Sequence, residues 1–173
     1  MRRIAGFTLV ELIVTTAVVA ILATIALPAW GALQERTSAA TASHRITTAF
    51  AMARIAAITR RTPVAVCPTE NGRDCADTIR WEGGWLVFED RRRLGRPERP
   101  QDILAAIDAV DRVSIRSTDG RRLVRYQPDG RSLGSNVTLS ICSLRTGQLV
   151  SRTVVNNVGR VRTERGRGSS CGT

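Results

Sequence analysis

The sequence predicts an α+β protein in which one long N-terminal helix, transmembrane in its first half, is followed by an antiparallel β-sandwich head. Three observations predict this. Residues 12–34 carry no charged side chain, helical periodicity continues to about residue 61, and residues 62–173 divide into short apolar runs separated by turn signals. The chain's 173 residues leave room for one modest domain beside the helix.

The charge-free run begins directly after Glu11 and is long enough to cross a bilayer. A helix over residues 12–34 rises about 35 Å at roughly 1.5 Å per residue. Arg2 and Arg3 favour a cytoplasmic start. Glu11 is unexpected, because an acid at mid-membrane depth costs about 2.5–3.5 kcal/mol and therefore calls for a partner.

Three interpretations of this segment compete. A secretory signal peptide would end in an A-x-A site, but the four alanines at positions 20, 23, 26 and 29 lie three apart. A plain signal anchor explains the basic start and leaves Glu11 unexplained. Cleavage after Gly6 would create an amine on Phe7, four residues before Glu11 on the same helical face. That amine can neutralise Glu11 of its own or a neighbouring subunit.

Beyond residue 30 the helix becomes amphipathic, and we expect residues 31–61 to pack on the head. A polar stripe and an apolar stripe recur at steps of three, four and seven residues. The polar stripe comprises Arg36, Ser43, Thr47, Arg54 and Arg61, and the apolar stripe comprises Ile46, Phe50, Ala53 and Ala57. Thr62-Pro63 ends the helix, because the residue before proline disfavours helical backbone.

Residues 62–173 have the pattern of antiparallel strands. Four X-Gly dipeptides typical of tight turns, at positions 71–72, 119–120, 129–130 and 146–147, separate short apolar or alternating runs. The predicted strands are residues 63–67, 85–90, 112–116, 123–127, 137–142, 149–155 and 158–163. Residues 101–110 fit a short helix or a further strand. This spacing favours a small sandwich of antiparallel sheets.

Four cysteines without a cluster of histidine favour two disulfides over a metal site. Three pairings are possible. We favour Cys67–Cys75 across a polar loop, and Cys142–Cys171, which would tie the C-terminal tail to an interior strand. Four buried free thiols are the alternative.

The head offers little for catalysis. It contains no histidine, so no Ser-His or Cys-His pair can form there. No metal-ligand cluster or phosphate-binding glycine loop stands out, and we expect no cofactor. Glu89 and Asp90 border a strand end and are expected to be surface residues. The chain is predicted not to be an enzyme.

The C-terminal third is strongly basic. The net charge is +11, all 26 basic residues are arginine, and residues 112–173 hold 12 arginines against three acids. Arg160 and Arg162 share a face if residues 158–163 form a strand, and Arg165 and Arg167 follow in a glycine-punctuated tail. Arginine forks suit phosphate oxygens, which favours salt-sensitive contact with a nucleic-acid backbone. A solvated basic edge, or a patch facing anionic lipid or a neighbouring subunit, is the alternative.

The N-terminus resembles the processing site of type IV prepilins and type II secretion pseudopilins. The resemblance rests on GFTLVEL at residues 6–12, which combines a short basic leader, glycine, phenylalanine and a glutamate at the fifth mature position. It implies a leader over residues 1–6, cleavage between Gly6 and Phe7 by a prepilin peptidase, and N-methylation of Phe7. Residues 7–30 would anchor the chain in the inner membrane before assembly with other pilins, with the head in the periplasm.

The head resembles the GspH/FimT branch of minor pilins and minor pseudopilins. The motifs are Trp81, Gly84-Trp85-Leu86-Val87-Phe88, Tyr126-Gln127-Pro128-Asp129-Gly130-Arg131, the run 137–142, Val154 and Gly159-Arg160-Val161-Arg162. The last pattern is similar to the DNA-binding element of the FimT type. The resemblance implies a minor type IV pilin near the pilus tip that contacts double-stranded DNA in natural transformation. The alternative is a structural GspH-like pseudopilin of a type II secretion system.

Overall fold

The computed structural model describes residues 8–166 and Cys171, apart from the side chains of residues 27–29. Gly6, Phe7 and Arg167 therefore lie outside the described residues. The chain divides into two compact units, Met1–Glu35 and Arg36–Thr173. The predicted α+β fold, a long apolar N-terminal helix followed by antiparallel sheets, is confirmed.

Helix α1 spans Leu9–Arg60 and ends one residue before the predicted end at about residue 61. Thr8 caps its start, because its Oγ1 accepts a hydrogen bond from the Glu11 N–H at 3.3 Å. Thr8 and Glu11 thus form the Thr-x-x-Glu pattern of helix starts. In the first unit the large apolar side chains from Leu9 to Ile25 are exposed, and the helix is long and apolar enough to cross a membrane.

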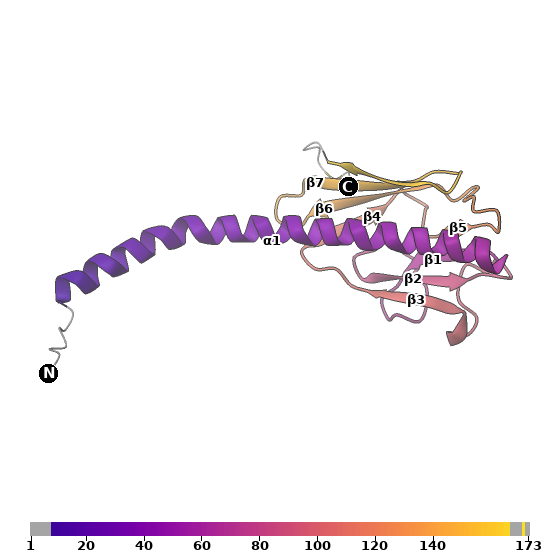
Figure 1. Cartoon of the computed structure of the whole chain (residues 1–173), viewed down its shortest axis with the longest axis horizontal. Coiled ribbons are helices and arrows are strands. Elements are labelled where there is room, and N and C mark those ends of the chain that lie inside the picture. The colour runs from indigo at the N-terminus through magenta and orange to yellow at the C-terminus, as the bar shows by residue number, and fades with distance from the viewer. Residues whose placement is uncertain (1–7, 167–170, 172–173) are drawn as a thin grey trace. The chain divides into compact units, whose positions relative to one another are not determined.

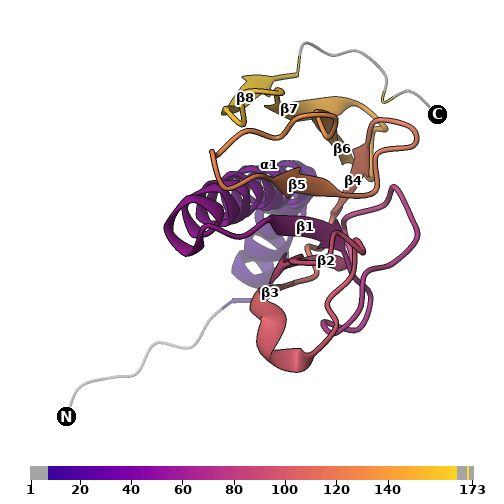
Figure 2. The same ribbon diagram turned by 90° about the vertical axis from the view of Figure 1, so that its right-hand side faces the viewer.

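The second unit contains two four-stranded antiparallel sheets (Figures 1 and 2). All seven predicted strands are present to within three residues, and residues 101–110 form a short 3-10 helix, Pro100–Asp102, followed by a strand. Sheet A, in the order β3-β2-β1-β5, contains β3 (Ile103–Asp108), β2 (Gly84–Glu89), β1 (Val64–Pro68) and β5 (Val124–Tyr126). Sheet B, in the order β4-β6-β7-β8, contains β4 (Val113–Ser117), β6 (Val137–Ser143), β7 (Leu149–Val155) and β8 (Val161–Arg165).

Residues 36–60 of α1 pack against both sheets and close one shared core (Figure 2). The predicted apolar stripe is buried, and each of its four residues is 1% exposed or less. Phe50 from this stripe lies 6.1 Å from Trp81, measured between ring centroids. Two members of the polar stripe bond sheet B: the hydroxyls of Ser43 and Ser151 lie 2.8 Å apart, and those of Thr47 and Thr163 lie 3.3 Å apart. The helix is therefore hydrogen-bonded to β7 and to the edge strand β8 of sheet B.

The two sheets differ in how their second faces are covered. Strands β1 and β2 are buried on both faces, and the second face of sheet A packs into a small cluster with Ile103 and Leu123. Strand β4 alternates between buried and accessible residues, and β7 does the same. Sheet B thus has one face in the core and one open face, which is typical of antiparallel sheets.

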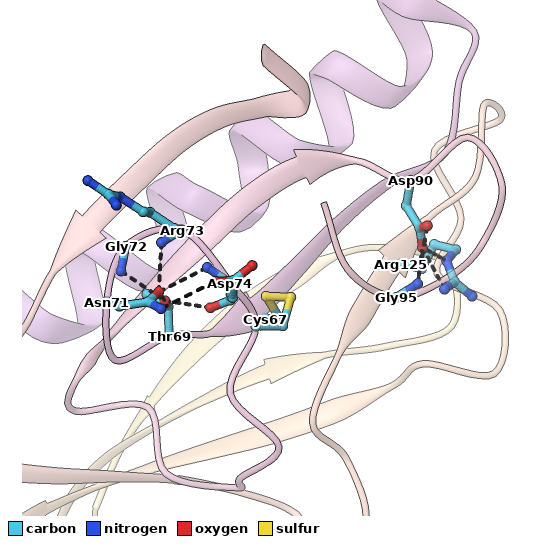
Figure 3. The surroundings of a disulfide bond; sticks show 10 residues. Cys67, Thr69, Asn71, Gly72, Arg73, Asp74, Asp90, Gly95 and Arg125 are labelled. Atoms are coloured by element: carbon cyan, nitrogen blue, oxygen red, sulfur yellow. Dashed lines mark hydrogen bonds and ion pairs between the residues drawn. A yellow bond between two sulfur atoms is a disulfide. The ribbon is translucent and has the colours of Figure 1, made fainter. Parts of the chain in front are cut away.

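Both disulfides have the pairing that the sequence favours, Cys67–Cys75 and Cys142–Cys171. The first closes a polar loop in which the Asn71 side-chain oxygen accepts hydrogen bonds from the N–H groups of Arg73 and Asp74, each at 2.9 Å (Figure 3). The second joins Cys171 to β6, and the Cys171 N–H also bonds the Gly147 carbonyl, in the turn between β6 and β7, at 3.1 Å. A residue near the C-terminus is therefore tied to sheet B.

Candidate nucleic-acid interface

The Gly-Arg-x-Arg motif lies at the turn between β7 and the edge strand β8. The Gly159 N–H bonds the Asn156 carbonyl at 2.8 Å, and the Arg160 N–H bonds Asn156 Oδ1 at 2.9 Å. Gly159 has a φ of +80°, which favours glycine. Moreover, a Cβ at this position would run into the Gly130 carbonyl of a neighbouring turn. The motif's glycine is thus required to seat the turn that carries the arginines.

Strand alternation divides the three predicted arginines that the structure describes, Arg160, Arg162 and Arg165. Arg162 and Glu164 lie on the open face of sheet B, and Arg160 shares their register immediately before the strand. Arg165 alternates with them, on the same side as Thr163, which bonds helix α1. The structure therefore brings Arg160 and Arg162 together and turns Arg165 away from them.

The two arginines on the open face differ in their partners. Arg162 Nε lies 2.8 Å from Glu164 Oε1, and both side chains are largely exposed, at 63% and 49%. Such an exposed pair contributes at most about 1 kcal/mol, so a phosphate can displace the carboxylate. Arg160 is exposed, and within residues 8–166 and 171 its side chain makes no ion pair.

The open face carries two further arginines that sequence reasoning missed. Pairing across the sheet places Arg116, Ser140, Arg152 and Glu164 in one row over four strands. Arg116 and Arg152 are both exposed. The alternating patterns of β4 and β7 could have placed each arginine on an outer face. Only the strand order and register, however, place them on the same face as the motif.

Glu89 and Asp90 correct an expectation, because both are buried rather than on the surface. Glu89 accepts hydrogen bonds from Arg60 at 2.6 Å and from Arg91 at 2.6 and 2.8 Å. Burial raises the pKa of the Glu89 carboxyl, but the bonds from Arg91 and Arg60 outweigh it and hold that pKa below its usual value. The Arg60–Glu89 pair ties the end of α1 to β2.

Asp90 connects the end of β2 with the loop that follows it and with strand β5. Its carboxylate accepts hydrogen bonds from Arg125 Nε at 2.7 Å and from the Gly95 N–H at 3.2 Å (Figure 3). Neither acid is placed to act on a ligand, since each is occupied by arginine. Across the described residues, no three histidine, cysteine, aspartate or glutamate side chains gather in a way that could hold a metal ion.

Solved structures with this fold come from pilus and secretion systems. The type IV minor pilin FimU of Pseudomonas aeruginosa is 13% identical, with a TM-score of 0.57, over 76% of this chain and 92% of that chain. The minor pseudopilin EpsH from the Type 2 Secretion System of Vibrio cholerae is 12% identical, with a TM-score of 0.52, over 74% and 97%. At these identities the likeness shows the fold alone. No curated protein matches the chain.

Two family descriptions match the sequence itself. The Prokaryotic N-terminal methylation motif matches residues 1–27, which contain Gly6, Phe7 and Glu11. The family described as Type II transport protein GspH matches residues 42–159, more than half of the chain, and ends directly before Arg160. The chain therefore belongs to the GspH family and is a minor pilin or pseudopilin with the N-terminal methylation motif.

Proposed function

We propose that this chain is a minor type IV pilin of the FimT type, which enters a pilus at or near its tip and contacts double-stranded DNA during natural transformation. One observation carries the proposal. Arg160 and Arg162 are both exposed on the open face of sheet B, at its edge strand. They belong to the third of the chain that contains 12 arginines and only three acids.

This arrangement suits the DNA backbone better than the bases. Guanidinium groups bind phosphate oxygens through two parallel N–H donors, and neutralising phosphates releases counterions regardless of base sequence. Residues 156–166 contain no aromatic side chain on which a base could stack. The contact we propose is therefore sequence-independent and salt-sensitive. Arg165 and Arg167 are secondary contributors, argued from charge alone.

Assembly depends on the N-terminus in this proposal. Prepilin peptidase cuts between Gly6 and Phe7, Phe7 is N-methylated, and the new amine neutralises Glu11 when apolar helices bundle in the filament. Before assembly the helix anchors the chain in the inner membrane with the head in the periplasm. After assembly the head is displayed on an extracellular pilus.

Binding of the full-length chain, held in a nonionic detergent, to a 20-bp duplex tests the DNA contact by fluorescence anisotropy across a salt series. With Arg160→Ala and Arg162→Ala together, we expect at least ~10-fold weaker binding at low salt and a log–log salt slope smaller by about 2, since each phosphate contributes about 0.9. Glu164→Gln should tighten binding, because it frees Arg162 from its carboxylate partner.

The matched control is Arg73→Ala with Arg96→Ala, which removes the same charge from exposed arginines in loops of sheet A. Unmeasurable binding of the unaltered chain at low salt would overturn the proposal. Equal losses from the control pair and the motif pair would do the same.

Replacing Glu11 tests the assembly role separately. Glu11→Ala should leave membrane insertion intact, since it removes a charge from an apolar helix, but should strongly reduce incorporation into filaments. Glu11→Gln is the sharper variant, because glutamine preserves the helix-capping pattern with Thr8 and lacks only the charge. Immunoblots of sheared filaments and of membranes measure both steps. Normal incorporation of Glu11→Gln would contradict the ion-pair role.

The second candidate is a structural minor pseudopilin of a type II secretion system. The family description, Type II transport protein GspH, and the shared fold with EpsH favour it. In that case deleting the gene abolishes protein export and leaves DNA uptake unchanged, and the purified chain shows no DNA binding at low salt.

A further inference from the structure

The open face of sheet B is hollowed beside the second disulfide. The hollow has a volume of about 450 Å³ and is lined by residues of β4, β6 and β7, together with Cys142 and Cys171. Arg116 and Arg152 line it from opposite sides, with the hydroxyls of Ser140 and Thr138 between them. Figure 2 shows these strands side by side at one side of the head.

The strand register sets the distance between the two arginines. Arg116 pairs with Ser140, and Ser140 pairs with Arg152, so the arginines stand two strands apart on one face. At about 4.8 Å per strand, their Cα atoms lie roughly 10 Å apart. Arginine side chains are long enough to bring both guanidinium groups to one anion across that gap. The Ser140 hydroxyl lies beneath them as a further donor.

These two arginines are also electrostatically available. The backbone of Arg80 forms an isolated β-bridge with that of Arg116. The Arg80 side chain forms an ion pair with Glu82 at 2.8 Å, and Arg162 forms one with Glu164. Within the described part of the chain, neither Arg116 nor Arg152 makes an ion pair. The lining holds one acid, Asp119, so the hollow keeps a net positive charge.

We propose that this hollow binds a phosphodiester group of the DNA backbone and extends the contact made by Arg160 and Arg162 across the whole open face. The inference rests on the proposed DNA contact. Arg162 lies one diagonal step from Arg152, because Arg152 pairs with Glu164. On ideal sheet spacings the face from Arg116 to Arg160 spans roughly 20 Å, which is the length of about six base pairs at 3.4 Å each.

The same anisotropy experiment tests the hollow with its own variants of the full-length chain. With Arg116→Ala and Arg152→Ala together, we expect about 10-fold weaker binding to the 20-bp duplex at low salt and a salt slope smaller by about 2. Arg116→Lys with Arg152→Lys should keep the slope and still bind a few-fold more weakly, because lysine keeps the charge but lacks the bidentate fork. Both pairs are exposed, so thermal unfolding should be unchanged.

The outcomes separate this inference from the motif's role. In one outcome, Arg116→Ala with Arg152→Ala binds DNA as the Arg73→Ala and Arg96→Ala control does, while the motif pair loses binding. The hollow then does not contact DNA, and only this inference is overturned. If the hollow pair loses binding and the motif pair does not, the phosphate contact at the hollow stands, and both the motif role and the continuous contact across the face are overturned. Absence of DNA binding by the unaltered chain overturns both.

Discussion

Gly159→Ala is expected to lower the free energy of unfolding of the head by about 3 kcal/mol, because two penalties combine at this position. The backbone φ of +80° costs a side-chain-bearing residue about 1 kcal/mol relative to glycine. The new methyl group would also collide with the Gly130 carbonyl and press on the Tyr126 ring, and overpacking of this kind costs about 1–3 kcal/mol. Urea denaturation followed by tryptophan fluorescence measures the loss, since Trp81 and Trp85 are buried in the head.

Gly147→Ala is the matched control for this prediction. Gly147 has a φ of +65° in the turn between β6 and β7, and no atom lies within 4 Å of the position that its Cβ would take. Gly147→Ala should therefore lower the free energy of unfolding only by the cost of the left-handed backbone conformation, about 1 kcal/mol. Equal losses at Gly147 and Gly159 would show that the close approach to Gly130 contributes nothing.

Asp90→Ala should destabilise the head by about 3 kcal/mol, the lower end for breaking a buried ion pair, because Arg125 retains some exposure. The Asp90 side chain is 2% exposed, and its loss leaves Arg125 Nε and the Gly95 N–H without their carboxylate acceptor. Among the described residues, the Arg125 side chain keeps only the Arg93 carbonyl, at 3.3 Å, as an acceptor. The same urea titration measures this change. Asp90→Asn should lose less stability than Asp90→Ala, since the asparagine side-chain oxygen can still accept one of these hydrogen bonds.

Asp111→Ala provides the surface control for Asp90. Asp111 is exposed in the turn before β4, and substitutions at such positions usually change stability by about 0.5 kcal/mol or less. A loss below 1 kcal/mol for Asp90→Ala would mean that water replaces the carboxylate at Arg125, and that the pair does not hold sheet A together.

Local chemistry was enough to predict most of the fold. The helix end follows from Thr62-Pro63, and the strand positions follow from short apolar runs between X-Gly turns, because both signals act within a few residues. Residues 101–110 were ambiguous, since the spacing of their apolar residues fits the helical period and the strand period. Pairing with β2 resolves them as the edge strand β3.

The candidate site was only partly predictable, because its residues come from separate strands. Arg160 and Arg162 share a face by simple alternation, which the sequence contains. Arg165 faces the other side because β8 continues through it, and the prediction ended that strand at residue 163. Arg116 and Arg152 required the pairing of β4, β6 and β7, which no local pattern encodes. The burial of Glu89 and Asp90 was not predictable locally, because Arg60 and Arg125, which pair with them, lie 29 and 35 residues away in sequence.

The disulfide between Cys142 and Cys171 makes the open face of sheet B dependent on the oxidation of two thiols. Disulfides persist in oxidising compartments and are rare where glutathione keeps thiols reduced, so this bond depends on an oxidising compartment. Without the bond, Cys171, which lines the hollow together with Arg116 and Arg152, is no longer covalently held to β6. Under the proposed function, oxidation after export would complete this lining only outside the cytoplasm, where the DNA to be taken up is met.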